Sequence, residues 1–456
     1  MRPEKDDGFA TWRLLSALPG VVFPALPARD AAEALAVLDQ LAASQWLPAE
    51  ALREKQHLQL ERVLAHAYET VPYYRARWGR PADVSRFAEL PLLGKEDLRG
   101  RFEDLGSRAV PADHGAVHAS STSGSTGVPV RVQKTAFVDR LWNAFTLRDH
   151  LWHGRDLREK LFVVRNRTPG LAQAPERAQN WGPATAALCA TGEALLLGTE
   201  TELGALLGRI AEERPGYLLA YPLVVAELAR LSLAKGERLQ GLREVRTYGE
   251  RLDPEVRELC RRAWGAKLTD HYSTVELGYL ALQCPEHEHY HVQAEGVLLE
   301  VLDDAGKPCA PGVPGRVVVT SLHNFAMPLI RYELGDFAEL GEPCPCGRGL
   351  PVLKRINGRT HATLVTRGGE RYWPYFGWVG ILDVAPLLQH QFIQKRYDLI
   401  EAHIVTAGRL PAEQEEALRR HLLERLPAGM RVELVYRERI EVPPGGKLQQ
   451  FFSEVA

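Results

Sequence analysis

The sequence is poor in cysteine and has almost no net charge. Six cysteines in 456 residues cannot form a dense disulfide scaffold, so we expect reduced thiols and a cytoplasmic location. The formal charge of −2 comes without a long basic run, which gives no indication of a surface for nucleic acid or anionic lipid. Prolines and acidic residues interrupt the N-terminal apolar stretch and no small-residue cleavage site follows it. We therefore expect neither a signal peptide nor a membrane span.

Length and composition indicate a soluble globular protein with more than one domain. Apolar residues make up 45% and charged residues 25% of the chain, a balance far from that of disordered proteins. Single hydrophobic cores stop growing near roughly 250 to 300 residues, so a chain of this length is expected to divide into at least two domains.

Hydrophobic periodicity predicts an α/β fold. Apolar positions recur at helical spacing over residues 30–70, and short β-rich runs alternate with helical ones over residues 160–340. This alternation favours a large multi-layer domain of helices and mixed sheets. A new pattern of strands and one strong helix begins after the Gly/Arg-rich segment 347–362. We therefore expect an N-terminal domain over residues 1–359 and a small mobile α+β domain over residues 360–456.

The segment 120–129, SSTSGSTGVP, gathers hydroxyl side chains and glycines in one loop. A polyphosphate needs many donors at short range, which glycine backbones and hydroxyls both supply. No lysine follows the second glycine, so the loop is not a Walker A motif. From the residues alone, a flexible connector remains the alternative. The phosphate-binding hypothesis involves Ser121, Thr122, Ser123, Gly124, Ser125, Thr126 and Gly127.

This loop resembles the phosphate loop of the adenylate-forming superfamily, which includes acyl-CoA synthetases, luciferases and peptide-synthetase adenylation domains. Further motifs follow in the family's order. Gly249-Glu250 is similar to the motif that borders adenine. The stretch HYSTVELG, residues 271–278, is similar to the family's Tyr-Gly-x-Thr-Glu motif. The resemblance implies that Tyr272 and Ser273 contact adenine and that Glu276 provides a carboxylate for Mg²⁺.

Three later positions complete the resemblance. Asp336, in the RYELGD segment, matches the aspartate that takes the ribose hydroxyls, and Arg359 matches the arginine at the hinge. Lys447 matches the mobile catalytic lysine. The resemblance thus implies catalytic roles for Lys447, Glu276 and Arg359. Taken singly, Asp336 is also typical of a turn, Glu276 of a solvated helix start and Lys447 of an exposed tail.

The chain departs from the family pattern at four places. Val275 replaces the usual threonine, Ser273 a glycine, and Tyr248 the glycine that often precedes Gly-Glu. His361, two positions after Arg359, stands where relatives usually have aspartate. The hinge match is therefore weak, and with it the prediction of a second half-reaction that needs the small domain to rotate.

The segments 44–78 and 90–99 are similar to the opening of phenylacetate-CoA ligase and its capsule-biosynthesis relatives. This resemblance implies ATP-dependent adenylation of a carboxylic acid, with release of pyrophosphate, followed by acyl transfer to coenzyme A. Transfer to an amine, giving an amide, is the alternative acceptor chemistry, and a non-catalytic nucleotide-binding scaffold is the alternative of another class. The expected partners are a small carboxylic acid, ATP and the acceptor; a homodimer is left open.

Cysteine and histidine concentrate at residues 284–291 and 344–346. Zinc prefers four thiolate or imidazole ligands in a closed structural site. The alternative is a surface strand of alternating histidines beside buried thiols. Relatives of similar sequence carry a Cys, His, Cys, Cys zinc site at these places. The resemblance implies that structural Zn²⁺ is bound by Cys284, His291, Cys344 and Cys346, with His289 as the rival ligand.

Overall fold

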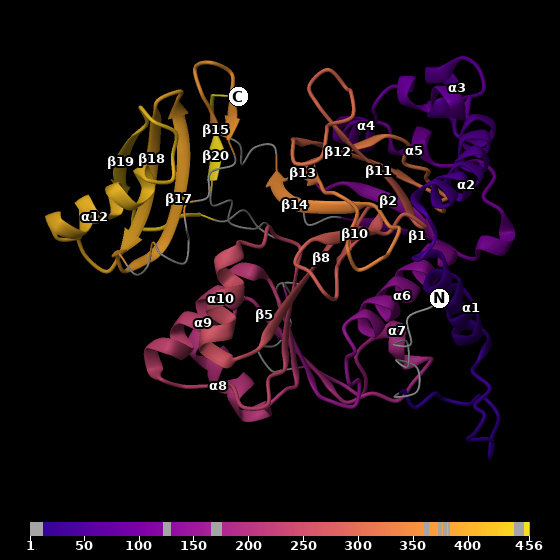
Figure 1. Cartoon of the computed structure of the whole chain (residues 1–456), viewed down its shortest axis with the longest axis horizontal. Coiled ribbons are helices and arrows are strands. Elements are labelled where there is room, and N and C mark those ends of the chain that lie inside the picture. Colours follow the sequence, from indigo (N-terminus) through magenta and orange to yellow (C-terminus); the bar gives the residue numbers. More distant parts are fainter. Residues whose placement is uncertain are drawn as a thin grey trace.

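The large domain is built on a mixed sheet that has twelve strands within the described residues (Figure 1). The computed structural model of the chain describes residues 12–121, 129–165, 176–359, 364–372, 376, 381, 384–441 and 451–455. In spatial order the strands are β11 (Val297–Leu302), β12 (Pro314–Ser321), β13 (Tyr332–Leu340), β14 (Val352–Arg359), β10 (Tyr290–Val292), β9 (Gly278–Gln283), β8 (Lys267–Thr274), β7 (Glu244–Tyr248), β6 (Tyr217–Ala220), β3 (Leu161–Arg165), β5 (Ala194–Gly198) and β4 (Glu176–Ala178). The predicted α/β fold is confirmed.

One half of this sheet is parallel, as the alternation of strands and helices predicts. Strands β3, β5, β6, β7 and β8 run in the same direction. Their crossover helices, α8 (Leu203–Glu213), α9 (Pro222–Lys235) and α10 (Pro254–Trp264), cover one face. Helix α10 begins with proline in its first turn and ends at Gly265 in the left-handed conformation, φ 71°. These are the residue types that favour a helix start and a helix stop.

The opposite face of the parallel half is covered by α1 (Arg29–Ser44) and α6 (Ala136–Trp152), with the short α7 (Pro183–Ala186) packed on α6. Figure 1 shows these helices on the far side of the strands from α8, α9 and α10. Helix α6 buries polar residues, Arg148, Asp149 and His150, as well as apolar ones. The side of the sheet that faces α6 is therefore the polar side of the domain.

The other half of the sheet is antiparallel from β8 to β11. Its core includes apolar side chains from α2 (Ala49–Thr70) and α3 (Pro72–Trp78). The short helices α4 (Lys95–Gly100) and α5 (Phe102–Leu105) and two 3₁₀ helices, Val84–Glu89 and Ala112–His114, lead to a hairpin of β1 (Val117–Ser121) and β2 (Arg131–Thr135). Among the described helices, none is both long and apolar enough to cross a bilayer.

The C-terminal part of the chain forms a separate sheet with its own core. Strands β19 (Arg431–Tyr436), β18 (Leu399–Thr406), β17 (Leu387–Arg396) and β20 (Phe451–Ser453) lie in that order, and α12 (Ala412–Leu423) packs on them. A two-stranded pair, β15 (Leu364–Val365) and β16 (Arg371–Tyr372), accompanies this sheet. Within the described residues this core contains nothing before Leu364. The exact domain boundary at residue 359 stays a prediction.

Candidate active site

Two residues predicted for the nucleotide site meet across the sheet. The Tyr272 hydroxyl, on β8, donates a 2.7 Å hydrogen bond to Oδ2 of Asp336, on β13. Both residues are buried, with 9% and 7% of their surface exposed. Asp336 also lies opposite Arg359 in the β13–β14 register. The carboxylate of Asp336 is therefore part of an internal site, and it is not the exposed turn residue that the alternative interpretation allowed.

The Gly249-Glu250 motif forms a sharp loop that reaches the end of β14. Gly249 has a φ of 73°, in the region that glycine adopts without strain. The next residue but one, Arg251, donates from Nη1 to the carbonyl of Asn357 at 3.4 Å. Its aliphatic part lies over Gly358, where a Cβ added to the glycine would be 3.5 Å from Cδ of the arginine. The loop that borders the predicted adenine site thus contacts the strand end that precedes Arg359, and Arg251 is a contact that sequence reasoning missed.

Aromatic rings line the carboxyl ends of the central parallel strands. The ring of Tyr248, which ends β7, lies 4.8 Å from that of Tyr221, which follows β6, and 5.9 Å from that of His271, on β8. Burial lowers the pKa of His271 to about 4, so its ring is neutral at pH 7. In open α/β sheets, ligands bind at the carboxyl ends of the strands. Tyr248, which departs from the family pattern, is therefore part of a cluster of aromatic rings at that edge.

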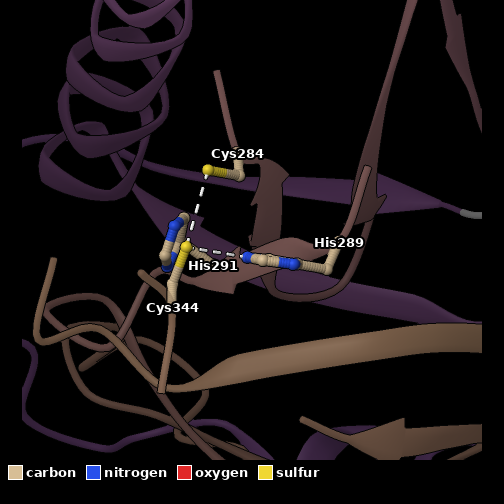
Figure 2. A group of neighbouring side chains, drawn as sticks. All are labelled: Cys284, His289, His291 and Cys344. Atoms are coloured by element: carbon tan, nitrogen blue, oxygen red, sulfur yellow. Dashed lines mark hydrogen bonds between the residues drawn. The ribbon is translucent and has the colours of Figure 1, made fainter. Parts of the chain in front are cut away.

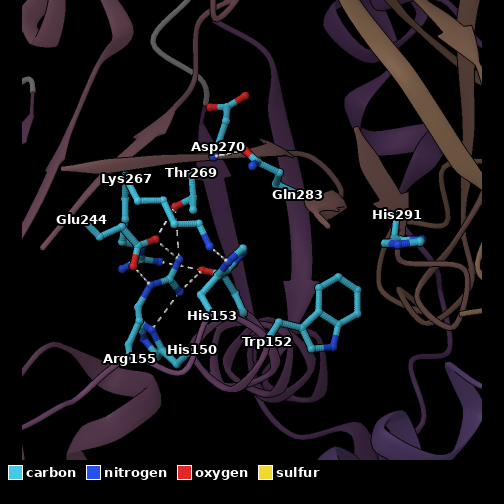
Figure 3. Close-up of polar contacts among 12 residues, drawn as sticks. His150, Trp152, His153, Arg155, Glu244, Lys267, Thr269, Asp270, Gln283 and His291 are labelled. Atoms are coloured by element: carbon cyan, nitrogen blue, oxygen red, sulfur yellow. Dashed lines mark hydrogen bonds and ion pairs between the residues drawn. The ribbon is translucent and has the colours of Figure 1, made fainter. Parts of the chain in front are cut away.

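A buried network of charges joins α6 to the parallel strands (Figure 3). Arg155 pairs with Asp149 at 2.6 Å and with Glu244 at 2.8 Å, and Arg246 pairs with the same Asp149 at 2.9 Å. Burial opposes ionisation of Asp149, but the two guanidinium groups outweigh it and hold its pKa well below the usual range. Because α6 contributes Asp149 while β7 contributes Glu244 and Arg246, the network fixes the helix on the strand whose last residue is Tyr248.

The cysteines and histidines predicted for zinc come together from two distant segments (Figure 2). Ligand atoms of Cys284, His289, His291 and Cys344 all lie within 4.8 Å of one another. The two sulfurs, of Cys284 and Cys344, are 3.8 Å apart, and Nε2 of His289 is 2.9 Å from Sγ of Cys344. Cys346 also approaches, with Sγ 3.4 Å from Nε2 of His291. His291 is fully buried, so this segment is not the surface strand of the alternative interpretation.

The loop that carries Cys344 and Cys346 is attached to the helices through Arg348. Its guanidinium lies between two indole rings, 4.7 Å from that of Trp46 and 4.8 Å from that of Trp152 at the end of α6. Arg348 also donates from Nε to Gln45 at 2.9 Å. Trp152 donates to the same Gln45 oxygen at 2.8 Å. The cysteine loop, α6 and the residues after α1 therefore form one packed unit.

Comparison with known proteins identifies the family. No protein-family model matches the chain. Over 349 residues the chain is 30% identical to phenylacetate-coenzyme A ligase of Thermus thermophilus, covering 72% of this chain and 74% of the relative. The chain belongs to the phenylacetate-coenzyme A ligase family. The corresponding ligase of Pseudomonas putida is 27% identical over 384 residues, 78% of this chain and 82% of the relative.

Solved structures support the same fold. A crystal structure of 2-hydroxyisobutyryl-CoA ligase in the postadenylation state aligns with a TM-score of 0.69 at 20% identity, over 90% of this chain and 91% of that one. An anthranilate CoA ligase aligns with a TM-score of 0.53 at 17% identity, over 72% and 64%. The adenylate-forming prediction is confirmed. This ligase is an AMP-forming acid ligase, whose reaction is adenylation of the acid followed by acyl transfer to coenzyme A.

Several predicted residues of this ligase lie outside the described residues. Among them are Thr122 to Gly127 of the phosphate loop, His361 and Lys447, and their roles stay predictions. Ser121 is the last residue of β1 and is exposed. Ser273 is half-buried at the end of β8. Glu276, in the turn between β8 and β9, has only 9% of its surface exposed, so it is not the solvated charge of the alternative interpretation.

The buried histidines of this ligase predict a loss of stability in mild acid. Burial lowers the pKa of His271 to about 4 and that of His153 to about 3, whereas both are near 6.5 when unfolded. Below pH 6.5 the unfolded chain therefore binds more protons than the folded one, and His271 alone should remove about 3 kcal/mol of stability by pH 4. The pKa values of Asp149 and Glu244 are lowered in the folded chain, so the stability that these carboxylates provide begins to be lost only below about pH 4.5.

Denaturant unfolding between pH 7 and 4.5 measures this effect. The free energy of unfolding should fall steadily below pH 6.5, and His271→Asn should make the slope shallower by up to one proton. The matched control is His57→Gln, which removes an exposed histidine on α2 and should leave the slope unchanged. Burial raises the pKa of Asp270 to about 6, which acts in the opposite direction, so the decisive comparison is between variants. An equal slope in His271→Asn and wild type would show that His271 is not neutral in the folded protein.

Proposed function

We propose that this ligase converts an aryl or arylacetic acid to its coenzyme A thioester through an acyl adenylate. The observation that carries the residue assignment is the hydrogen bond from Tyr272 to Asp336, because it joins the predicted adenine-stacking ring to the predicted ribose ligand. The rings of Tyr221, Tyr248 and His271 support a planar acid, since aromatic rings favour offset or edge contacts with another ring.

In the proposed reaction the acid's carboxylate attacks the α-phosphate of ATP, and pyrophosphate leaves. Negative charge grows at the α-phosphate, so a cation directed at that atom lowers the barrier. Lys447 takes this role. Asp336 accepts hydrogen bonds from the ribose hydroxyls, assisted by Arg359. Glu276 would hold Mg²⁺, which supplies positive charge beside the phosphates; its buried position close to β8 is consistent with such a ligand.

The deciding experiment is acid-dependent exchange of pyrophosphate into ATP. Aryl, arylacetic, amino and fatty acids are tested separately, and the products formed with coenzyme A or with amines are then identified by mass spectrometry. We expect exchange with aryl or arylacetic acids and a thioester as the product. An amide as the main product would contradict the proposed acceptor, and exchange restricted to fatty acids would contradict the proposed acid.

The phosphate loop predicts a selective loss of triphosphate affinity. Replacement of Ser123 and Thr126 by alanine removes two hydroxyl donors, and each charge-assisted hydrogen bond contributes roughly 1.5 to 3 kcal/mol. ATP should therefore bind about a hundred- to ten-thousandfold more weakly, whereas AMP, which lacks the outer phosphates, should change little. Calorimetric titration with both nucleotides measures the difference. Unchanged ATP affinity would show that the loop is a flexible connector and does not bind phosphate.

The Cys/His cluster is proposed to hold one structural Zn²⁺. Zinc–sulfur bonds of about 2.3 Å in a tetrahedron separate two sulfurs by about 3.8 Å, and the sulfurs of Cys284 and Cys344 are 3.8 Å apart. The donor set of thiolates and imidazoles also suits zinc. His291 would be the third ligand, and His289 and Cys346 compete for the fourth position. With four protein ligands the ion has no open position, so its role is to join the two segments.

A further inference from the structure

The β1–β2 hairpin, whose two strands are connected in the chain by the predicted phosphate loop, carries a buried lysine. The two strands pair from Val117 opposite Thr135 to Ser121 opposite Arg131, so the SSTSGSTGVP motif closes the hairpin. Successive side chains of β2 point to opposite faces. Val132 and Lys134 face inward, with 0% and 7% of their surface exposed, whereas Arg131 is exposed. Helix α6 begins directly after β2, beside this hairpin (Figure 1).

The ammonium of Lys134 makes no hydrogen bond or ion pair with any residue that the structure describes. Burial lowers the pKa of Lys134, and the charges of Asp139 and Glu276 only partly offset this from a distance. Asp139 instead faces His118, with Oδ2 3.5 Å from Nε2, and about half of its side chain is exposed. A buried cation without a direct partner destabilises the fold. An anionic ligand bound at this position would neutralise the buried ammonium.

Glu276 is a second buried charge, and it acts on Lys134. It lies in the turn between β8 and β9, is as deeply buried as Tyr272, and likewise makes no hydrogen bond or ion pair with a described residue. Burial lowers the pKa of Lys134, and the charge of Glu276 partly offsets this, although the two side chains form no ion pair. A magnesium nucleotide would satisfy both charges, because its phosphates are anionic and its metal ion is a cation that carboxylates bind.

We propose that Lys134 is a phosphate-binding residue of the adenylation site, fixed in the large domain, whose ammonium contacts the β- and γ-phosphates of ATP. The SSTSGSTGVP segment contains hydroxyls and glycines but no lysine or arginine, so it supplies no side-chain cation of its own to the outer phosphates. Lys447 belongs to the small domain and serves the α-phosphate. Lys134 would therefore hold pyrophosphate before and after the reaction. This inference rests on the proposed phosphate role of the loop.

The test compares ligands that differ only in their phosphates. For Lys134→Gln and Lys134→Met, calorimetry with Mg-ATP, Mg-pyrophosphate and AMP should show a loss of about ten- to a hundredfold for the first two ligands and less than about twofold for AMP. The melting temperature without ligand should stay the same or rise, because an unpaired buried charge has been removed. Lys134→Arg keeps the charge and should recover part of the ATP affinity.

The matched control is Arg131→Gln, which removes a cation from the exposed face of the same strand, where it lies over the ring of Phe102. It should leave all three affinities unchanged. Equal losses for ATP and AMP, or a fall in melting temperature with unchanged ATP affinity, would assign Lys134 a structural role and overturn the proposal. Wild-type protein that fails to bind Mg-ATP would overturn the proposed phosphate loop itself, whereas wild-type binding with an unaffected Lys134→Gln removes the Lys134 proposal alone.

Discussion

Replacement of Lys447 by alanine should lower acyl-adenylate formation by about a hundred- to a thousandfold. The ammonium is expected to act on charge that develops at the α-phosphate only in the transition state, and removal of one such group from an active site has effects of this size. Binding of ATP in the ground state should change much less. Single-turnover measurement of the acyl adenylate, with the acid identified by the exchange experiment, gives the effect directly.

The second half-reaction provides the internal comparison for Lys447. Transfer of the acyl group from a preformed adenylate to coenzyme A involves no attack on the α-phosphate, so Lys447→Ala should leave this step within a few fold of wild type. The control variant is Lys395→Ala, which removes a partly exposed lysine of the same domain that pairs with Glu454 at 2.6 Å. It should retain both half-reactions. Equal losses in both half-reactions of the Lys447 variant would refute its assignment to adenylation.

Local sequence patterns predicted the parallel half of the fold but not its continuation. Within the predicted segment 160–340, the described strands and helices alternate from β3 to β8, and the later strands follow one another without helices. The alternating part could be predicted because period and propensity are local properties. The antiparallel strands β9–β14 join the same sheet through pairings such as β10 with β14, which are about 60 residues apart in the chain. No local pattern specifies such a partner.

The candidate site was also predicted only in part from the sequence. The family resemblance assigned Tyr272 and Asp336 to one nucleotide site, but nothing in either segment alone indicates their contact across the sheet. Arg155 and Glu244 could not be predicted as buried, since charged residues are mostly exposed and become buried only when a partner neutralises them. Lys134 escaped notice for the same reason. A lysine in a strand is usually a surface residue, and only the three-dimensional structure shows that it is enclosed.

For the Cys/His cluster the sequence named all five donors, including His289 as the rival ligand, and the structure groups them in space. His291 lies in β10 and His289 directly precedes that strand, and both side chains reach sulfur atoms of the cluster. The cluster therefore offers five donors for an ion that takes four. Single variants decide between the candidates. Whichever of His289→Gln and Cys346→Ser loses zinc identifies the fourth ligand, and the other should keep it.

Simultaneous replacement of Cys284 and Cys344 by serine should abolish zinc binding and lower the melting temperature by roughly 5 to 15 °C. The two residues come from the turn after β9 and from the loop between β13 and β14, so the ion closes a long stretch of chain. Its loss should also release the loop that carries Arg348 and weaken the contacts of that residue with Trp46 and Trp152. Metal analysis of protein purified without chelator should find about one zinc per wild-type chain.

The matched control for this prediction is Cys309→Ser, which changes a buried thiol outside the cluster and should keep both the metal and most of the stability. Trp152 ends α6, and the ion pairs of Asp149 fix α6 to β7, whose last residue is Tyr248. Loss of zinc should therefore also disturb the aromatic rings proposed to contact the acid. We expect a weaker affinity for the acid with little change for AMP. Wild-type protein that never contained zinc would show that the cluster is held by thiol and imidazole contacts alone. A double variant that keeps its zinc would show that the ion is bound by other residues.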